Sequence, residues 1–453
     1  MNQAPIQEFA DKVSSIFVPV VIGISLSTFL VWYILASFTD LIPKSWMKGQ
    51  SPATFAVMFA LPTLVISCPC ALGLATPTAV MVGTGVGATH GVLIKGGEKL
   101  EMVSRIEAVV FDKTGTLTKG KPVISDFIRV KTSSEHGKML SDEDLIWLLG
   151  SLENNSNHPL ANAVVAYSEK HGMSEKLQFA TPLNLCAITG KGISGDIQQR
   201  SVGLGNRSFA AVKQIELSAE VERAMARLEH AGRTAVFACV DDEVLAVIGI
   251  SDEIRDDSKA TIHYLQQHCI DVWMVSGDNC RTSSAVAQAL GISMEYVISE
   301  ALPDTKLEKV KSLQHEGKVV AMVGDGINDS PALAQANIGI SLSSGTEIAT
   351  ETADIILMKG DIGDVCVAID VARSIFNRIK INFLCALLYN CLCIPIAAGL
   401  FYPLVQITLP PVIAAAAMAL SSISVVISSL SLRCYKAPII KKSLPQHSTI
   451  IHV

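Results

Sequence analysis

The chain has 453 residues, of which 49% are hydrophobic and only 17% are charged, and its formal net charge is −6. Such a composition is too apolar for a purely soluble protein, and it predicts membrane-spanning helices beside soluble domains. The acidic balance gives no basic surface for nucleic acid, so we expect no nucleic-acid partner.

Four apolar stretches are long enough to span a membrane, and each lacks Asp, Glu, Lys and Arg after its first residues. They are Val13–Phe38, Thr54–Val82, Phe383–Tyr402 and Val405–Leu430. Four spans leave both termini on one side, and the basic tail after residue 432 predicts that this side is the cytoplasm. The polar stretch between the second and third spans is then cytoplasmic as well.

The second span is interrupted by Cys68-Pro69-Cys70. Proline removes a backbone donor, and residues two apart on a regular helix point about 200° apart. The two thiols can therefore face one ion only if the helix unwinds at Pro69. The alternative is that both cysteines are small packing residues at a proline kink. Five of the eleven cysteines lie in the spans, so we expect reduced thiols rather than disulfides.

Three apolar runs in the polar stretch end in acidic, glycine-containing turns. They are "IEAVVFDKTGTLTKGKP" at 106–122, "DVWMVSGDN" at 271–279 and "KVVAMVGDGIND" at 318–329. Helical segments separate them, which predicts an open α/β domain with its site at the carboxyl ends of parallel strands. Residues 124–244 interrupt this pattern with helices and a glycine-punctuated strand region of their own. We expect them to form a separate inserted lobe.

The acidic turns predict phosphoryl chemistry. Asp112 ends the first run in a tight turn beside Thr114, where a carboxylate can act as a nucleophile toward phosphorus. Asp325 and Asp329 are oxygen ligands suited to Mg²⁺, and Lys306 supplies a positive charge for a transferring phosphoryl group. An ordinary acidic turn is the alternative for any one segment alone.

The third and fourth spans carry side chains that are costly in lipid. Tyr389 and Asn390 lie in the third span, and Met418 and Ser422 share one face of the fourth because they are four residues apart. Two thiolates and a thioether are soft donors that favour Cu⁺, whereas Zn²⁺ more usually gains a histidine or carboxylate. We expect the other cysteines of the third span to be packing residues.

Together these segments resemble the P-type ATPases, pumps that form an aspartyl-phosphate in a haloacid dehalogenase-like domain. The Cys-Pro-Cys, Tyr-Asn and Met-x-x-Ser-Ser motifs resemble the cuprous branch of the heavy-metal-transporting (CPx-type) group. The resemblance implies a multi-pass α-helical membrane domain plus a cytoplasmic α/β haloacid dehalogenase-like phosphorylation domain with an inserted α+β nucleotide-binding domain. The implied boundaries are membrane helices at 1–94 and 363–432, phosphorylation domain at 95–123 and 245–362, nucleotide-binding domain at 124–244, and cytoplasmic tail at 433–453.

The resemblance also implies the site residues. Catalytic roles fall on Asp112, Thr114 and Lys306, and Mg²⁺ ligation on Asp112, Asp325 and Asp329. The implied nucleotide-binding residues are Glu153, His158, Gly190, Gly192, Asn206, Ser276, Gly277 and Asp278. The implied Cu⁺ ligands are Cys68, Cys70, Tyr389, Asn390, Met418 and Ser422. The implied partners are ATP, the lipid bilayer and a copper chaperone that delivers Cu⁺.

Members of this group also contain an actuator domain with a Thr-Gly-Glu loop and N-terminal metal-binding domains with Cys-x-x-Cys, and neither motif occurs here. The sequence therefore predicts an N-terminally truncated pump that phosphorylates itself at Asp112 without full turnover. Two alternatives stay open. One is a P-type ATPase that exports Zn²⁺ or Cd²⁺, and the other is a non-pumping copper-binding or regulatory remnant.

Overall fold

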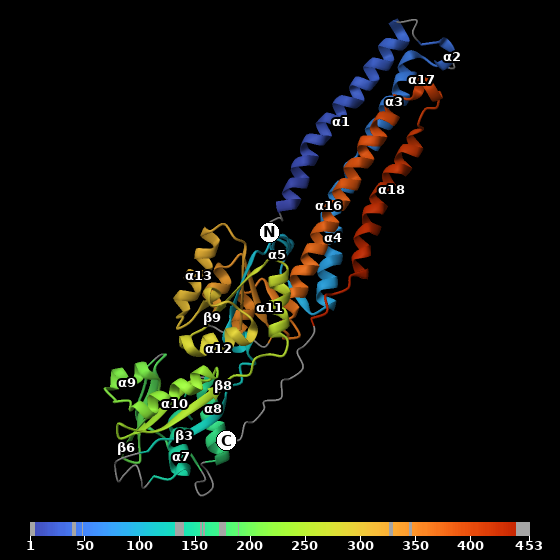
Figure 1. Cartoon of the computed structure of the whole chain (residues 1–453). Helices are drawn as coiled ribbons and strands as arrows, with labels where there is room; N and C mark the ends of the chain where they lie inside the picture. Colours follow the sequence, from blue (N-terminus) through green and yellow to red (C-terminus); the bar gives the residue numbers. More distant parts are fainter. Residues whose placement is uncertain are drawn as a thin grey trace. The chain divides into compact units, whose positions relative to one another are not determined.

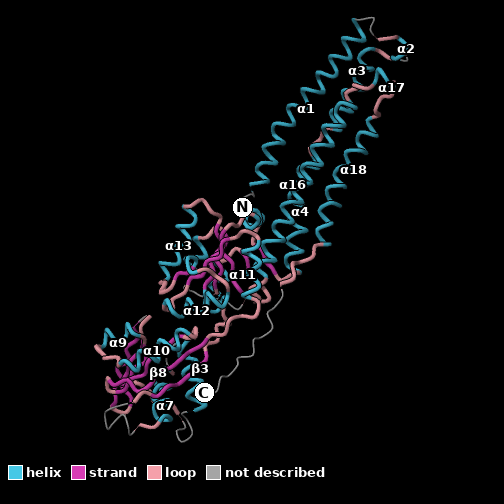
Figure 2. Tube along the Cα trace, viewed as in Figure 1, coloured by secondary structure: helices cyan, strands magenta, loops and turns pink. Residues whose placement is uncertain are grey.

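The computed structural model describes residues 5–38, 42–47, 49–131, 140–154, 156, 159–171, 178–188, 190–325, 329–343 and 347–440. The chain divides into two compact units. The first contains the residues up to Arg105 together with Cys366–Pro438, and the second is built around Ile106–Val365. Figure 1 shows that long helices dominate the first unit, and Figure 2 shows that the strands of the second unit gather into two sheets.

The first unit contains the apolar helices. Its elements are α1 (Pro5–Phe38), α2 (Lys44–Met47), α3 (Pro52–Ile66), α4 (Cys70–Thr89), β1 (Val92–Ile94), α5 (Gly97–Ser104), α16 (Asp364–Ala397), α17 (Tyr402–Val405) and α18 (Pro411–Leu430). Four stretches are long and apolar enough to cross a membrane, at Lys12–Phe38, Pro52–Thr89, Asp364–Ala397 and Pro411–Cys434. The four predicted spans are therefore confirmed as helical segments of spanning length.

The bounds of the last two spans differ from the prediction. α16 already begins at Asp364 and ends at Ala397, before the turn at Gly399, whose φ is +83°. The fourth helix does not begin at Val405, because α17 ends there with Gln406 in the left-handed conformation. Proline is favoured in the first turn of a helix, and α18 starts at Pro411.

Aromatic side chains hold one end of the helices of the first unit together. The Trp32 ring of α1 stacks on Phe59 of α3 with centroids 4.4 Å apart, and Tyr402 meets both rings edge-on. The indole of Trp32 also donates a 2.9 Å hydrogen bond to the carbonyl of Ala398. A Cβ at Gly399 would lie 2.6 Å from the Phe59 ring, so the turn and the aromatic cluster require a glycine there.

The second unit contains a parallel sheet with the order β13 (Ile355–Leu357), β12 (Ile338–Leu342), β11 (Val320–Gly324), β2 (Ala108–Asp112), β9 (Asp271–Val275) and β10 (Val297–Ile298). Its helices are α11 (Ser258–Gln267), α12 (Cys280–Leu290), α13 (Pro303–His315), α14 (Ser330–Gln335) and α15 (Glu347–Thr352). We call this part the parallel-sheet lobe. The neighbours of β2 are both parallel to it, so the loops that follow β2, β9 and β11 meet at one edge, as predicted.

The inserted segment forms a six-stranded antiparallel sheet. Its strands in order are β3 (Val123–Arg129), β8 (Glu243–Ser251), β7 (Thr234–Val240), β6 (Arg200–Gly205), β5 (Gly192–Ile197) and β4 (Leu183–Ile188). Its helices are α7 (Asp142–Glu153), α8 (Pro159–His171), α9 (Arg207–Lys213) and α10 (Ala219–His230). We call it the antiparallel-sheet lobe. β8 runs to Ser251, so this sheet extends past the boundary that we expected at residue 244.

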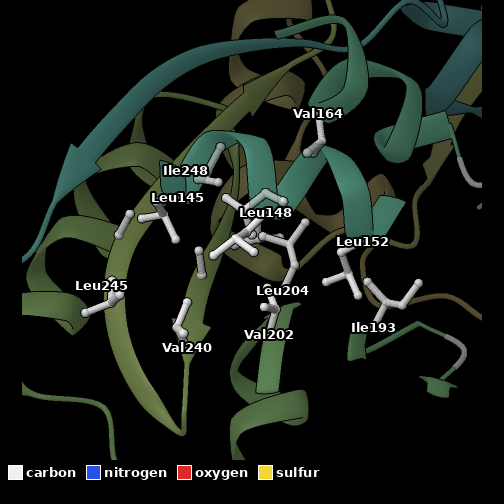
Figure 3. Packing of buried hydrophobic residues seen from close by; sticks show 14 of the residues in the cluster. Leu145, Leu148, Leu152, Val164, Ile193, Val202, Leu204, Val240, Leu245 and Ile248 are labelled. Carbon is white, nitrogen blue, oxygen red and sulfur yellow. The ribbon is translucent and has the colours of Figure 1, made fainter. Parts of the chain in front are cut away.

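Apolar side chains of α7 pack on one face of the antiparallel sheet (Figure 3). Leu145, Leu148 and Leu152 recur every three or four residues, so they share one face of the helix. They pack with Val202 and Leu204 of β6. Glu153 ends the same helix, so this packing fixes where its side chain begins.

Candidate active site and metal-binding site

Asp112 lies at the carboxyl end of β2, next to a lysine and a second carboxylate. All five residues of β2 are buried, so the strand places Asp112 inside the lobe. The Lys306 ammonium of α13 donates hydrogen bonds of 2.6 Å to Asp112 Oδ1 and 2.6 Å to Asp329 Oδ1. All three side chains are less than a tenth exposed. The structure thus joins three of the predicted residues in one buried ionic cluster.

A third carboxylate, Asp325, completes the cluster. Oxygen atoms of Asp112, Asp325 and Asp329 lie within 4.8 Å of one another. Burial, followed by the charge of Asp329, raises the pKa of Asp112 to about 7 and that of Asp325 to about 6. Burial alone would lower the pKa of Lys306, but the charges of Asp112 and Asp329 raise it above its ordinary value. One lysine therefore balances only part of the negative charge, which leaves room for a cation.

The turn after Asp112 requires glycine. Gly115 has a φ of +75°, and a Cβ built there would lie 1.8 Å from Asp325 Oδ2. A side chain at this position would therefore displace one of the three carboxylates. Thr114, which precedes it, is exposed at the surface of the turn.

Two residues of this site were missed in the sequence. Arg255 donates hydrogen bonds of 2.7 Å to the Gly115 carbonyl and 3.0 Å to the Thr118 carbonyl. Asp252 accepts from the backbone N–H of Lys121 at 3.1 Å. Both follow β8, and their only signal in the sequence is a charged cluster directly after an apolar run. They hold the turn in shape through its backbone.

The loop after β9 lies beside the same turn. Lys113 and Asp278 form an ion pair, so the residue after Asp112 is tied to this loop. The backbone N–H of Asp278 bonds the Ser276 hydroxyl at 3.1 Å, and Ser276 is buried. The predicted segment Ser276, Gly277 and Asp278 therefore borders the Asp112 turn, with the Asp278 carboxylate facing Lys113.

The expected nucleotide residues of the antiparallel-sheet lobe gather partly into one place. Gly192 begins β5, and the Asn206 side-chain N–H group donates to the Gly190 carbonyl at 2.9 Å. The side-chain oxygen of Asn206, Oδ1, caps α9 by accepting a hydrogen bond from the Phe209 backbone N–H at 3.1 Å. Both ends of this amide are therefore used inside the lobe, where they hold Gly190 in place.

Glu153 is buried at the end of α7, and burial raises the pKa of its carboxyl group. Leu152, beside it in the chain, packs in the same core as Ile193 of β5 (Figure 3). His158 lies outside the described residues.

Replacement of Gly192 by alanine is expected to destabilise the antiparallel-sheet lobe by about 1–3 kcal/mol, the usual cost of overpacking. A Cβ there would lie 2.4 Å from the Leu204 carbonyl oxygen and 2.7 Å from the Gly205 Cα, and backbone atoms cannot easily move away. Gly190→Ala is the control, because nothing lies within 4 Å of its Cβ position and the cost is limited to its φ of +72°. Thermal unfolding without nucleotide checks this, and a Gly192→Ala variant that melts at the same temperature as the parent would contradict it.

The predicted break in the second span is confirmed. α3 ends at Ile66 and α4 begins at Cys70, so the helix is interrupted at the Cys-Pro-Cys segment. The expectation of reduced thiols is wrong for this pair in this structure, where Cys68 and Cys70 form a disulfide across a Cα separation of 5.4 Å. The reason is the interruption itself, which turns both sulfur atoms to the same side. Binding of a metal by these thiolates requires reduction of the bond.

Small apolar clusters flank the predicted donors along each helix. In one, Ile66 packs with Ala397 and Ala414, with Tyr389 and Ala417 against them. In the other, Ala71 packs with Ala386 and Val425.

The cysteine, methionine and serine donors lie between these two clusters in the sequence. Cys68 and Cys70 fall between Ile66 and Ala71, and Met418 and Ser422 fall between Ala414 and Val425.

Tyr389 and Asn390 differ from Asn382 in how their polar groups are used. The Tyr389 hydroxyl is buried and makes no hydrogen bond of normal geometry with the described residues, and Asn390 is buried as well. Asn382 is fully paired, because it donates to Ser429 Oγ at 3.0 Å and accepts from Ser428 Oγ at 2.6 Å. Asn382 thus connects α16 to α18, whereas the Tyr389 hydroxyl has room for a further partner.

Comparisons with known proteins give a family and several relatives for this chain. Residues 106–337 match the family model for haloacid dehalogenase-like hydrolases. The chain is 45% identical to the copper-transporting ATPase HMA5 of Oryza sativa subsp. japonica, over 97% of this chain and 43% of that protein. It is 40% identical to copper-transporting ATPase 1 of Mus musculus, over 96% of this chain and 33% of that protein.

Among solved structures, a zinc-transporting PIB-type ATPase in the E2.Pi state is 30% identical with a TM-score of 0.70. That match covers 95% of this chain and 65% of the solved chain. The chain spans less than half the length of each of the two copper-transporting relatives, 43% of the first and 33% of the second.

Proposed function

Because this chain belongs to the haloacid dehalogenase-like hydrolases, we propose that it is the catalytic and membrane part of a heavy-metal-transporting P-type ATPase, a pump that couples ATP hydrolysis to Cu⁺ transport. One observation carries the proposal. A buried Asp112–Lys306–Asp329 cluster, with Asp325 beside it, occurs in the same chain as a spanning helix that is broken at Cys-Pro-Cys.

The chemical step that we propose is transfer of the γ-phosphoryl group of ATP to Asp112. A carboxylate oxygen of Asp112 forms a bond to the γ-phosphorus, the bond from that phosphorus to the β,γ-bridging oxygen breaks, and ADP leaves with the electron pair. Lys306 is already hydrogen-bonded to Asp112, so it can balance negative charge on the incoming phosphoryl group without moving far. Thr114, exposed on the turn, is a further group for the phosphoryl oxygens.

The carboxylate cluster fits a divalent cation. It offers only oxygen donors, and the pKa values of Asp112 and Asp325 are raised by burial first and then by the negative charge of Asp329, which a cation would balance. We propose that Asp112, Asp325 and Asp329 hold Mg²⁺. When bound, Mg²⁺ would supply positive charge to the phosphoryl oxygens.

ATP is proposed to bind mainly in the antiparallel-sheet lobe, at residues 124–244. Glu153, Gly190 and Gly192 form part of that site, together with His158, and Asn206 acts by holding the Gly190 loop. Ser276, Gly277 and Asp278 would meet the nucleotide from the parallel-sheet lobe, where Asp278 borders the Asp112 turn.

Cu⁺ is proposed to cross at the broken helix. The ligands would be the reduced thiolates of Cys68 and Cys70 and the thioether of Met418, with Tyr389, Asn390 and Ser422 around them. The Tyr389 hydroxyl supports a ligand here, since a buried polar atom normally has a partner and, among the described residues, this hydroxyl has only the Cys393 thiol beside it, without a hydrogen bond of normal geometry. We propose that Zn²⁺ is not the cargo, because the curated relatives described above are copper-transporting and no carboxylate or histidine occurs in the cores of the predicted spans.

The orientation follows from the ATP site. The ATP-binding lobes and both termini are proposed to face the cytoplasm, where ATP is available, and a cytoplasmic copper chaperone is the proposed Cu⁺ donor. Such a carrier is chemically reasonable because free Cu⁺ is readily oxidised.

Metal-dependent phosphorylation tests the function. The reduced, detergent-solubilised chain is expected to take up label from γ-³²P-ATP and Mg²⁺ when Cu⁺ is present, and to take up far less with Zn²⁺ or with a Cu⁺ chelator. This experiment measures phosphoenzyme formation, which uses residues present in this chain. Equal labelling with Zn²⁺ would favour the zinc alternative, and no labelling with either metal would favour a non-pumping remnant.

A further inference from the structure

Glu229 is a buried carboxylate with partners in both lobes of the second unit. It lies in the last turn of α10, in the antiparallel-sheet lobe, and is only 1% exposed. Its Oε1 accepts hydrogen bonds from Arg207 at 2.5 Å and from the Asn279 side chain at 2.7 Å. Its Oε2 accepts from Arg281 at 3.1 Å. Arg207 belongs to the antiparallel-sheet lobe, whereas Asn279 and Arg281 belong to the parallel-sheet lobe.

Two further hydrogen bonds join the antiparallel-sheet lobe to the parallel-sheet lobe. The Thr234 hydroxyl at the start of β7 donates to Asp278 Oδ1 at 3.3 Å. The Thr282 hydroxyl of α12 donates to the Arg233 carbonyl at 3.0 Å. Glu229 is the buried carboxylate of this set, and it accepts hydrogen bonds from three donor residues.

The chain itself connects the two lobes by two segments that lie side by side. It passes from one lobe to the other near 118–123 and returns near 251–255, and the two crossings are neighbours. Val123 pairs with Ser251, and Thr118 forms a bridge with Ile254. Two adjacent crossings leave rotation about one line free, so a third contact away from that line is needed to fix the angle. The Glu229 contacts provide it.

The loop that Glu229 contacts also reaches the catalytic turn. Asn279 caps α12 by accepting from the Thr282 N–H at 2.9 Å, so its position is fixed by the helix. Asp278, the residue before it, pairs with Lys113, which follows Asp112. A change in how Glu229 holds Asn279 is therefore passed to a loop that borders the phosphorylation site.

We propose that Glu229 is a positioning residue that sets the angle between the two lobes, so that ATP bound to the antiparallel-sheet lobe presents its γ-phosphate to Asp112. This rests on the proposed function. Glu229 contacts neither Asp112 nor any residue that we assign to Mg²⁺. It acts through Asn279 and Arg281.

Glu229→Gln removes the charge and keeps the shape of the side chain. Arg207 and Arg281 are 33% and 49% exposed at their side chains, so they can turn to water when the carboxylate is lost and the fold should survive. We expect the maximal rate of phosphorylation by saturating ATP to fall by about tenfold or more, since small misplacement of reacting groups is costly. The ATP concentration for half-maximal rate should change less than twofold, because the nucleotide contacts remain.

Acetyl phosphate separates positioning from chemistry. It carries no nucleoside, so it can phosphorylate Asp112 without the antiparallel-sheet lobe, and its rate should be the same for Glu229→Gln and the parent chain. Arg281→Gln, which breaks the same contact from an exposed side chain, should reproduce the selective loss with ATP. Glu222→Gln is the matched control. Glu222 also pairs with Arg207 but contacts no side chain of the parallel-sheet lobe among the residues that the structure describes, so the rates of this variant should stay within twofold of the parent.

The outcomes are distinct. Equal loss with ATP and acetyl phosphate, or no loss with either, would overturn the positioning role of Glu229. A parent chain that neither phosphoryl donor labels would instead contradict the proposed function.

Discussion

Asp112→Asn is expected to abolish the phosphoenzyme, with labelling from ATP reduced by at least about 10³-fold, because an amide cannot serve as the nucleophile. The residue is buried beside Asp329, and these surroundings raise the pKa of its carboxyl group to about 7. A neutral side chain is therefore tolerated there, and without Mg²⁺ the variant should be at least as stable as the parent. The parent loses stability as the pH rises from about 4 to about 7, because over this range the carboxyl is ionised in the unfolded chain but protonated in the folded one, so at pH 8 the parent bears the full cost and the asparagine variant bears none.

Acid-quenched labelling with γ-³²P-ATP, followed by hydroxylamine, checks this prediction, because hydroxylamine cleaves an acyl phosphate. Asp271→Asn is the matched control. It lies at the start of β9, opposite Ala108, at the other end of the same sheet. Its labelling should equal that of the parent. Hydroxylamine-sensitive label on the Asp112→Asn variant would show that another residue is the nucleophile.

The double variant Cys68→Ser, Cys70→Ser is expected to lose Cu⁺ dependence altogether. Hydroxyl groups are hard donors that bind Cu⁺ poorly. We expect the affinity for Cu⁺ to fall by more than about 100-fold, since changes to residues merely behind metal ligands already cost 10–100-fold. The serines preserve the size of the side chains, so the break between α3 and α4 should remain.

A competition assay with a Cu⁺ chelator, under a reductant that opens the Cys68–Cys70 disulfide, gives the affinity. Cys391→Ser is the control, because this cysteine lies on a different apolar helix, α16, and outside the proposed ligand set. It should bind Cu⁺ as the parent does. Unchanged Cu⁺ affinity in the double variant would remove the Cys-Pro-Cys segment from the site.

Much of the fold follows from local patterns. The run Ala108–Asp112 is four apolar residues and an aspartate, and that pattern already predicts a buried parallel strand with an acidic end. The spans follow from hydropathy in the same way. The start of α16 at Asp364 does not follow from hydropathy. The first half of this helix mixes charged and apolar residues, and only its second half is apolar throughout.

Contacts between distant segments were harder to predict. The Asp112 and Asp325 turns could be paired because both end parallel strands. Arg255 could not, because it binds backbone carbonyls, which carry no sequence signal. Glu229 is equally hidden, since its partners in the parallel-sheet lobe lie about fifty residues further along the chain and look like ordinary surface residues.

The pairing of Asn382 with Ser428 and Ser429 has a consequence for biosynthesis. Asn382 lies where the apolar part of α16 begins, and its two partners lie 46 and 47 residues later in the chain. When the ribosome has made α16 but not yet α18, this amide is unpaired. We therefore expect α16 to reach its final packing only after α18 has been made, when these hydrogen bonds can form between the two helices.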